Sequence, residues 1–359
     1  MSGDRRAEPL LAYALSGSLN EGDTIDNPGL AIYMSRLDDY FAVLDTMFIG
    51  DTSVQMYDGF FTFEEMENGP CPVKWDQTGP FNYYCDEYSG GKMPTGCVVT
   101  AVAQLMATYR YPDSYNGYSF DWENMIKRSN ELLEGSWPED TTRDEVGKDT
   151  IIVGINDSID ISIGIGDWEP EEPDSIMLQI AWLMHELGSD DNLNSYPVND
   201  STATAANMTN IPRTFENFGY ASGGHLVYYH DSDGCHEFDA ITELLNGHYV
   251  IMAGQEVYDY GTYWSVTSVL SAHCWLVHGL MTYNKADTDN PYFGTHYYLC
   301  NFGWRGIADG YYLSTVFDIN KGPVYDEDGT RKKGPRKGLV DEYNFSDLDY
   351  MQYIIGIRK

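Results

Sequence analysis

The stretch from Pro94 to Pro112, PTGCVVTAVAQLMATYRYP, constrains the fold more than any other segment. Its apolar side chains recur at helical spacing, which predicts an amphipathic or buried helix that Pro112 ends. Thr95 is placed to cap this helix, and Gly96 leaves room for another backbone beside Cys97. Cys97 then lies where several amide N–H groups have no partner within the helix, at the positive end of the helix dipole. That position favours the nucleophilic thiolate, so Cys97 is a candidate activated cysteine; the alternative is a small buried residue that starts a core helix.

The overall composition excludes several classes of protein. The 359 residues are enough for one large core, or for a catalytic domain with an additional segment. The formal net charge of -35, from 21 Lys plus Arg against 56 Asp plus Glu, repels phosphate backbones, so no nucleic acid partner is expected. No apolar run reaches the roughly 18 to 20 residues of a membrane helix, so no membrane span is expected. The first residues, MSGDRRAEPLLAY, contain no apolar signal core, which indicates either a cytosolic protein or one whose targeting sequence is not present.

Four segments, in order along the chain, resemble one family. PTGCVVTAVAQLM closely resembles the nucleophile segment of the streptopain-type cysteine proteases, peptidase family C10, which are relatives of papain. CPVKWDQTGPFNYYC resembles the entry motif of that family, SAHCWLVHGLMTY its small-small-His segment, and CNFGWRGIADGYYL its Asn-aromatic-Gly-Trp-Gly run. The resemblance implies a papain-like α+β fold, in which a helical half carries the nucleophile and an antiparallel β half carries the histidine. The change to strands rich in Tyr, Val and Leu after the helices agrees with that arrangement.

His273 and Asn301 are the candidate partners of Cys97. A thiol needs a nearby base, and the leaving amine needs an acid; one imidazole can serve as both. The resemblance gives His273 this part, while Asn301 can hold the imidazole in the right tautomer and Trp304 can shield their contact from water. His273 lies 176 residues (273 minus 97) after Cys97, somewhat more than the roughly 130 to 150 of papain-type enzymes. An acidic insertion at about 129–173 can absorb the excess.

Gln77 is the candidate for stabilising negative charge. Acyl transfer develops charge on the carbonyl oxygen, and a side-chain amide opposite the backbone N–H of the nucleophile can stabilise it. Ordinary loop hydrogen bonding is the alternative for a glutamine between turn residues. The chain also departs from the family pattern, because Phe302 stands where the family more often has Trp and Arg305 interrupts the usual Trp-Gly-Gly. Both changes leave the acid–base chemistry in place and leave the pocket shape and the level of activity open.

Residues 1–64 resemble the C-terminal part of a streptopain-type propeptide, and residues 65–359 are interpreted as the papain-like catalytic domain. The N-terminal part reads as a short strand and turn followed by an amphipathic helix. A propeptide blocks its own enzyme, so the chain would be a shortened zymogen with a processing point between about Phe60 and Pro72. Further along, DSIMLQIAWLMHELG predicts a helix that Asp174 caps and Gly188 ends.

Two residues complete the predicted substrate cleft together with Trp304. Ser201 lies in a Ser/Thr/Ala loop, of which some residue between 201 and 205 is expected to touch substrate; a plain interhelical connection is the alternative. Ala272 precedes His273 and leaves a narrow approach to it. The histidines and the cysteine between residues 225 and 236 do not have the spacing of paired zinc ligands, so no metal and no cofactor is predicted.

The remaining cysteines bear on the geometry. If His273 and Asn301 point into one cleft from neighbouring strands, then Cys274 and Cys300 point to the opposite face, where they could be neighbours as buried thiols or as a less expected disulfide. Cys71 and Cys85 could be joined if their Cβ atoms approach to about 4 Å.

The function that best fits these observations is a cysteine endopeptidase that hydrolyses peptide bonds through a thioester and is made as a zymogen. Its partners would be protein or peptide substrates and its own propeptide. The family resemblance implies a bacterial protein that is secreted or at the cell surface. The alternatives are a catalytically inactive secreted or surface binding protein on the same fold, and a papain-like acyl transferase.

Overall fold

The computed structural model describes residues 10–14, 27–47, 59–88, 91–135, 173–198, 203–228, 230–231, 234–235, 237–258, 268–285, 294–307, 309–314 and 351–359. In the described residues, no helix is both long and apolar enough to cross a membrane.

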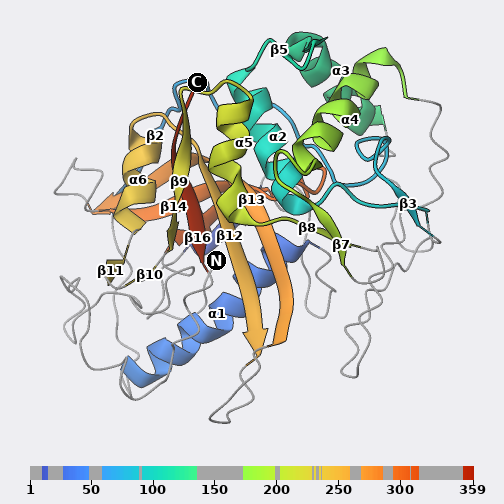
Figure 1. Ribbon diagram of the computed structural model, residues 1–359. Helices are drawn as coiled ribbons and strands as arrows, with labels where there is room; N and C mark the ends of the chain where they lie inside the picture. Colours follow the sequence, from blue (N-terminus) through green and yellow to red (C-terminus); the bar gives the residue numbers. More distant parts are fainter. Residues whose placement is uncertain are drawn as a thin grey trace.

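An antiparallel sheet forms the centre of the molecule (Figure 1). The long central strands are rich in Tyr, Val and Leu, and β14 is buried along its whole length because both faces of the sheet are covered. This confirms the predicted antiparallel β half. The strands pair in the order β1 (Ala12–Ala14), β15 (Gly310–Leu313), β14 (Thr295–Asn301), β13 (Ser268–Lys285), β12 (Val250–Tyr258), β16 (Gln352–Arg358) and β9 (Ser222–Tyr228), while β2 (Gly59–Glu64) pairs with the end of β13.

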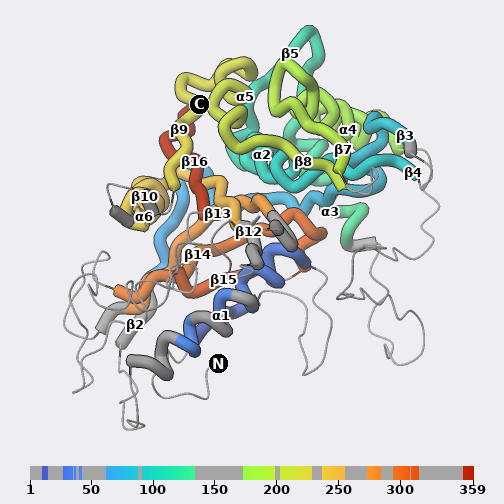
Figure 2. The backbone as a smooth tube through the Cα atoms, turned by 60° about the horizontal axis from the view of Figure 1, so that its bottom comes forward, coloured from blue at the N-terminus to red at the C-terminus, as the bar shows by residue number. Residues whose placement is uncertain are grey.

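Helices cover both faces of this sheet (Figure 2). Helix α2 (Cys97–Tyr109) packs against β13 on one face, and α3 (Trp122–Gly135) and α4 (Ser175–Gly188) complete the helical half around it. Helix α5 (Ile211–Asn217), the 3-10 turn η2 (Met208–Asn210) and α6 (Glu237–Leu245) lie against the β9 and β16 side of the sheet. Helix α1 (Pro28–Met47) crosses β12 and β13 on the other face. The predicted helical half is therefore confirmed, and an N-terminal helix faces it across the sheet.

The described residues also form four short two-stranded hairpins outside the central sheet. They are β3 (Glu87–Tyr88) with β4 (Gly91–Lys92), β5 (Ser114–Tyr115) with β6 (Tyr118–Ser119), β7 (Tyr196–Val198) with β8 (Ala203–Ala205), and β10 (His230–Asp231) with β11 (Gly234–Cys235). The β7–β8 pair flanks and partly replaces the Ser/Thr/Ala loop that was predicted to contact substrate.

The predicted bounds of the helix after Asp174 are confirmed, and one further helix overlaps the predicted acidic insertion. Asp174 caps α4 by accepting bonds from the N–H groups of Ile176 (3.0 Å) and Met177 (2.9 Å), and the helix ends at Gly188. Helix α3 continues to Gly135, so residues 129–135 of the predicted acidic insertion are part of a packed helix. The rest of that insertion, apart from Pro173, lies outside the described residues.

Close packing joins α1 to the end of β14. A Cβ atom at Gly29 would lie 1.9 Å from Cδ1 of the Phe302 ring, so only glycine allows the helix to come this near. The side chain of Asn27 donates a hydrogen bond to the carbonyl of Ile307 (2.7 Å) in the following loop. The N-terminal helix is thus fixed directly over the residue that follows Asn301.

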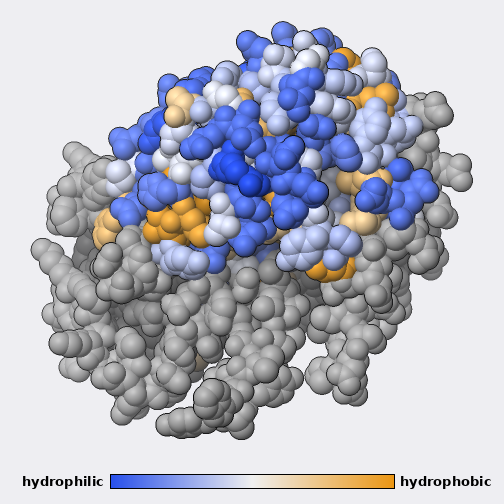
Figure 3. Space-filling view, in the orientation of Figure 1, coloured by the Kyte–Doolittle hydropathy of each residue, from blue (hydrophilic) through white to orange (hydrophobic). Residues whose placement is uncertain are grey.

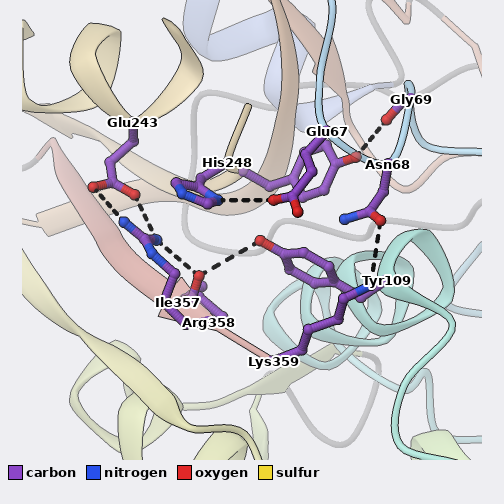
Figure 4. A network of polar contacts seen from close by, with 10 residues as sticks. Glu67, Asn68, Gly69, Tyr109, Glu243, His248, Ile357, Arg358 and Lys359 are labelled. Carbon is purple, nitrogen blue, oxygen red and sulfur yellow. Dashed lines mark hydrogen bonds and ion pairs between the residues drawn. The ribbon is translucent and has the colours of Figure 1, made fainter. Parts of the chain in front are cut away.

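The opposite end of α2 lies among polar contacts made by the C-terminal strand (Figure 4). Arg358 donates two hydrogen bonds to the Glu243 carboxylate (2.8 and 3.0 Å), and the Lys359 ammonium contacts the side-chain oxygen of Asn68 (3.3 Å). Tyr109, the last residue of α2, bonds to the carbonyl of Ile357 (3.5 Å). These contacts tie the end of the chain to the helical half. The face of that half seen in Figure 3 is mainly hydrophilic, with small separate apolar patches.

Candidate active site

Cys97 is the first residue of α2, as the sequence predicted. The N-cap residue of α2 is Gly96, with φ of 93°, and no side chain makes a capping hydrogen bond there. The predicted cap by Thr95 is therefore wrong. The Thr95 hydroxyl lies 3.1 Å from the Thr100 hydroxyl instead. The backbone N–H of Thr95 donates to the carbonyl of Gln77 (2.8 Å). The chain before the cysteine is therefore held by tertiary contacts rather than by a local cap.

Gly96 allows a second backbone to lie against the start of α2, as predicted. A Cβ atom at this position would be 2.9 Å from the carbonyl oxygen of Thr204 in β8. The Thr204 hydroxyl donates to the carbonyl of Pro94 (2.6 Å). Strand β8 thus forms a wall beside Cys97, which places one residue of the predicted 201–205 stretch next to the nucleophile. Ser201 itself lies outside the described residues.

The Cys97 thiol keeps part of its surface exposed, yet burial raises its pKa above the ordinary value. Hydrogen bonds from the backbone at Cys274, at Val98 and at Cys97 itself act in the opposite direction. Bonds that lower a thiol pKa stabilise the thiolate, so N–H groups donate them to the sulfur. The helix terminus therefore acts on the sulfur as expected, but the loss of solvent has the larger effect. The contact with Cys274 also brings the sulfur to the residue that directly follows His273.

The His273 imidazole is buried among aromatic rings. Its centroid lies 6.2 Å from Trp275, 6.4 Å from Phe302 and 6.4 Å from Trp304. Its Nε2 atom is 2.8 Å from the backbone carbonyl of Phe302. Because a carbonyl oxygen only accepts, Nε2 carries the proton in this contact. Burial lowers the pKa of His273 to about 4, so the ring is neutral at pH 7.

The register of β13 and β14 separates His273 from Asn301. Asn301 lies directly opposite Leu276. Opposed residues share a face and successive residues alternate, and Leu276 is three positions from His273, so the two side chains point to opposite faces. Asn301 donates to the carbonyl of Val73 (2.8 Å) and accepts from the N–H of Gly303 (3.0 Å). In this arrangement the imidazole is held by the Phe302 carbonyl, and Asn301 supports the loop that follows it.

The same register corrects the expectation for Cys274 and Cys300. Cys300 lies opposite Val277, three positions from Cys274, so the two thiols are on opposite faces and are not neighbours. The Cys274 sulfur lies 3.6 Å from that of Met208, and the Cys300 sulfur 3.7 Å from the carbonyl of Tyr298. Cys71, Cys85, Cys274 and Cys300 are free thiols, so neither suggested disulfide forms.

Gln77 sits in a loop that is tied to the approach to Cys97. Its N–H donates to the Asp76 carboxylate (2.6 Å), and its carbonyl accepts from the N–H of Thr95, two residues before the cysteine. The residue is half-buried. This arrangement brings the loop expected to supply a side-chain amide close to the backbone around the nucleophile.

Trp304 and Ala272 were both predicted to border the substrate cleft near His273, and both lie in the described part of the chain. Trp304 is half-buried with its ring near the imidazole, but the contact between His273 and Asn301 that it was expected to shield is not formed. Ala272 belongs to β13 and pairs with Gln255 of β12. The Phe302 carbonyl is a site atom that sequence reasoning missed, because a backbone contact leaves no signal in the residue type.

Asp309 is a second residue that was missed. Its carboxyl accepts from the N–H of Phe302 (2.9 Å), and burial raises its pKa to about 7. Asp309 thus fixes the peptide that precedes Phe302, one peptide unit before the carbonyl that contacts His273. The Asp-Gly-aromatic ending of the family motif was the signal that could have pointed to it. In the described residues, no group of three His, Cys, Asp or Glu side chains could hold a metal ion.

The fold and the site together define a class. A cysteine at the start of a buried helix lies beside a strand that carries a histidine, within an α+β arrangement of a helical half and an antiparallel sheet; this is the papain-like cysteine protease fold. Residues 75–312 match the model of the peptidase C10 family, so the chain belongs to that family, whose members are cysteine peptidases.

Two solved structures are similar to this chain. A mutant fragment of prointerpain A from Prevotella intermedia has a TM-score of 0.54 and 16% identity, and the match covers 97% of this chain and 88% of that one. Active wild-type interpain A from the same organism, a cysteine protease, has a TM-score of 0.45 and 17% identity, with 80% of this chain and 94% of that one covered. The first match extends the similarity in fold to almost the whole chain. A sequence comparison with curated proteins gave no match.

Proposed function

We propose that the protein is a cysteine endopeptidase in which Cys97 is the nucleophile and His273 the general base and acid. The observation that carries the proposal is the contact between the Cys97 sulfur and the backbone of Cys274, because it brings the nucleophile to the residue after His273. A sulfur at a helix terminus with N–H donors around it is suited to attack on a carbonyl carbon.

The reaction would run in two stages. His273 removes the Cys97 proton, the thiolate attacks the peptide carbonyl, and the Gln77 amide with the Cys97 N–H stabilises the negative oxygen. The imidazolium then protonates the leaving amine as the C–N bond breaks and a thioester forms. Water, deprotonated by the same imidazole, hydrolyses the thioester and restores the thiol. Trp304 covers the imidazole, and Ser201 and Ala272 are proposed to border the bound peptide.

We further propose that this chain is the inactive precursor. Nε2 of His273 bonds to the Phe302 carbonyl and α1 packs directly on the Phe302 ring, so the N-terminal helix helps to set the position of the imidazole. Residues 1–64 would then act as the propeptide, and residues 65–359 as the catalytic domain. The proposed processing window, 60 to 72, overlaps β2, which pairs with β13 from Gly59 to Glu64. A cut after β2 would leave that strand held only by its pairing.

The substrates would be proteins or peptides. By family resemblance, we place the enzyme outside a bacterial cell, where its formal net charge of -35 favours solubility. An inactive binding protein is the second candidate, and the separation of Asn301 from the imidazole is the observation in its favour. An acyl transferase would use the same thioester with an amine as acceptor.

One experiment separates the first two. The full chain and Cys97→Ala are incubated under reducing conditions with a thiol-directed epoxide present or absent, followed by N-terminal sequencing and mass spectrometry. The protease predicts cleavage between 60 and 72 in the wild type alone, and a covalent adduct on Cys97. A wild-type chain that stays intact, hydrolyses no added peptide and takes up no epoxide contradicts it.

A further inference from the structure

Arg305, a departure from the family pattern, makes the most concentrated set of polar contacts near the site. Its Nε donates to the Asp76 carboxylate at 2.6 Å. Its terminal nitrogen donates to the Thr78 hydroxyl (3.2 Å) and to the carbonyl of Gly79 (3.3 Å). The guanidinium therefore spans the loop on both sides of Gln77.

Asp76 joins this arginine to Gln77. The Asp76 side chain is only 7% exposed, against 25% for Arg305, so the pair is largely removed from water. One carboxylate oxygen accepts from the N–H of Gln77 at 2.6 Å, and the other accepts from Arg305 and from the Thr78 hydroxyl (2.9 Å). Charged hydrogen bonds of this kind are stronger than neutral ones and fix geometry.

The backbone at Arg305 shows that this contact is maintained against a local cost. Its φ is 55°, in the left-handed region that favours glycine. A residue keeps such a conformation only where its surroundings fix it, and the side-chain contacts of Arg305 are such a constraint. The Gln77 carbonyl is fixed from the other side by the N–H of Thr95, which leads to Cys97.

We propose that Arg305 is a positioning residue, which acts through Asp76 to hold Gln77 at the place where the negative oxygen of the tetrahedral intermediate develops. This inference rests on the proposed protease function. The proposed role accounts for the departure from the family pattern at position 305. The guanidinium joins the loop that carries the Gln77 amide to the loop that carries Trp304. Arg305 itself need not touch the substrate.

The test uses Arg305→Gly, because glycine removes the guanidinium and also relieves the left-handed backbone, so the variant is expected to fold. Rates are measured on a fluorogenic peptide and divided by the amount of Cys97 that an epoxide titrates. Removing one donor to the developing oxyanion costs about 100- to 1,000-fold in kcat. We expect Arg305→Gly, which misplaces this donor, to lower kcat about 10-fold or more with KM within about twofold.

Three comparisons make the result specific. Arg305→Lys keeps the charge without the planar fork and should recover part of the lost kcat. Alkylation of Cys97 by iodoacetamide needs the thiolate but no oxyanion stabilisation, so its rate should match the wild type in both variants. Arg358→Ala removes another arginine–carboxylate pair, which Figure 4 shows in the same network as Tyr109. Tyr109 ends α2, and a helix of 13 residues places it about 18 Å from Cys97. Arg358→Ala should leave kcat unchanged.

Coupling to Gln77 decides the outcome. If Arg305 acts through Gln77, the double variant Arg305→Gly with Gln77→Ala should be about as slow as Gln77→Ala alone. Losses that multiply in full, or a wild-type kcat in Arg305→Gly, overturn the inference and leave the proposed function in place. A wild-type chain that has been processed between 60 and 72, alkylates at Cys97 and still hydrolyses no peptide contradicts the proposed function, and this inference with it.

Discussion

The surroundings of Cys97 and of His273 differ in how ready they are for chemistry. The sulfur already faces backbone N–H groups, and the segments that flank it, at Gln77 and Thr204, are tied to the residues before α2. The imidazole is enclosed by aromatic rings, and its Nε2 proton is committed to the Phe302 carbonyl. The comparison shows that the helix and its neighbours place the sulfur, while the imidazole is placed by contacts with Phe302, on which α1 packs.

Replacing the nucleophile should have the largest effect. Cys97→Ala is expected to lower peptide hydrolysis by roughly 10⁴-fold or more, since loss of an attacking group removes the covalent route. The sulfur makes few bonds, so the midpoint of thermal unfolding should stay close to that of the wild type. A Cys274→Ala variant, which removes the neighbouring thiol, serves as the control and should retain activity. Hydrolysis that survives in Cys97→Ala would assign the reaction to another residue.

Loosening the contact between α1 and Phe302 should make the His273 region as ready for catalysis as the Cys97 region. Gly29→Ala places a methyl group against the Phe302 ring, and overpacking of this kind costs about 1–3 kcal/mol. We expect the uncut chain to hydrolyse peptide faster, because Phe302 and its carbonyl are displaced from His273. The readout is the initial rate, measured before self-cleavage. Ala42→Gly is the matched control, since it weakens the same helix by about 0.5–1 kcal/mol at an exposed position. Equal rates in the two variants would contradict control through Phe302.

Through His273, a lower pH should decrease the free energy of unfolding. The pKa of His273 is lowered from 6.5 to about 4, so the unfolded chain binds a proton that the folded chain does not as pH falls from about 6.5 to about 4. This contribution is present above pH 6.5 and is lost on acidification, by about 3 kcal/mol for 2.5 pKa units. Asp309, with a pKa raised from 3.8 to about 7, acts in the opposite direction over the whole of this range, because the folded chain binds that proton first.

Urea unfolding at several pH values measures this effect. The difference between the wild type and His273→Phe isolates the histidine, because Asp309 is present in both. The free energy of unfolding should fall less steeply with acid in His273→Phe. Parallel pH curves for the two proteins would show that the imidazole does not titrate as its burial requires.

The sequence was sufficient to predict the cysteine side. A helix over the right residues, the close approach at Gly96 and the antiparallel half all followed from local patterns. The relation of His273 to Asn301 could not be predicted, because it depends on which residue of β13 pairs with Asn301. A shift of one position exchanges the faces of a strand, and tertiary packing sets that register. The Thr95 cap failed for a similar reason, since contacts with Gln77 and Thr100 compete for its backbone and side chain. The structure leaves the catalytic assignments of Cys97, His273, Asn301 and Gln77 as predictions.

The pH dependence of Cys97 alkylation tests the central claim most directly. Iodoacetamide rates are measured on the uncut chain held with its N-terminal segment, on the chain after processing, and on processed His273→Ala. In the uncut chain, burial keeps the thiol pKa above its ordinary value of 9.0, so alkylation should rise only in alkaline solution. After processing, an imidazole near the sulfur should move that rise to lower pH, and His273→Ala should abolish the shift. The same profile in all three proteins would contradict the pairing of Cys97 with His273.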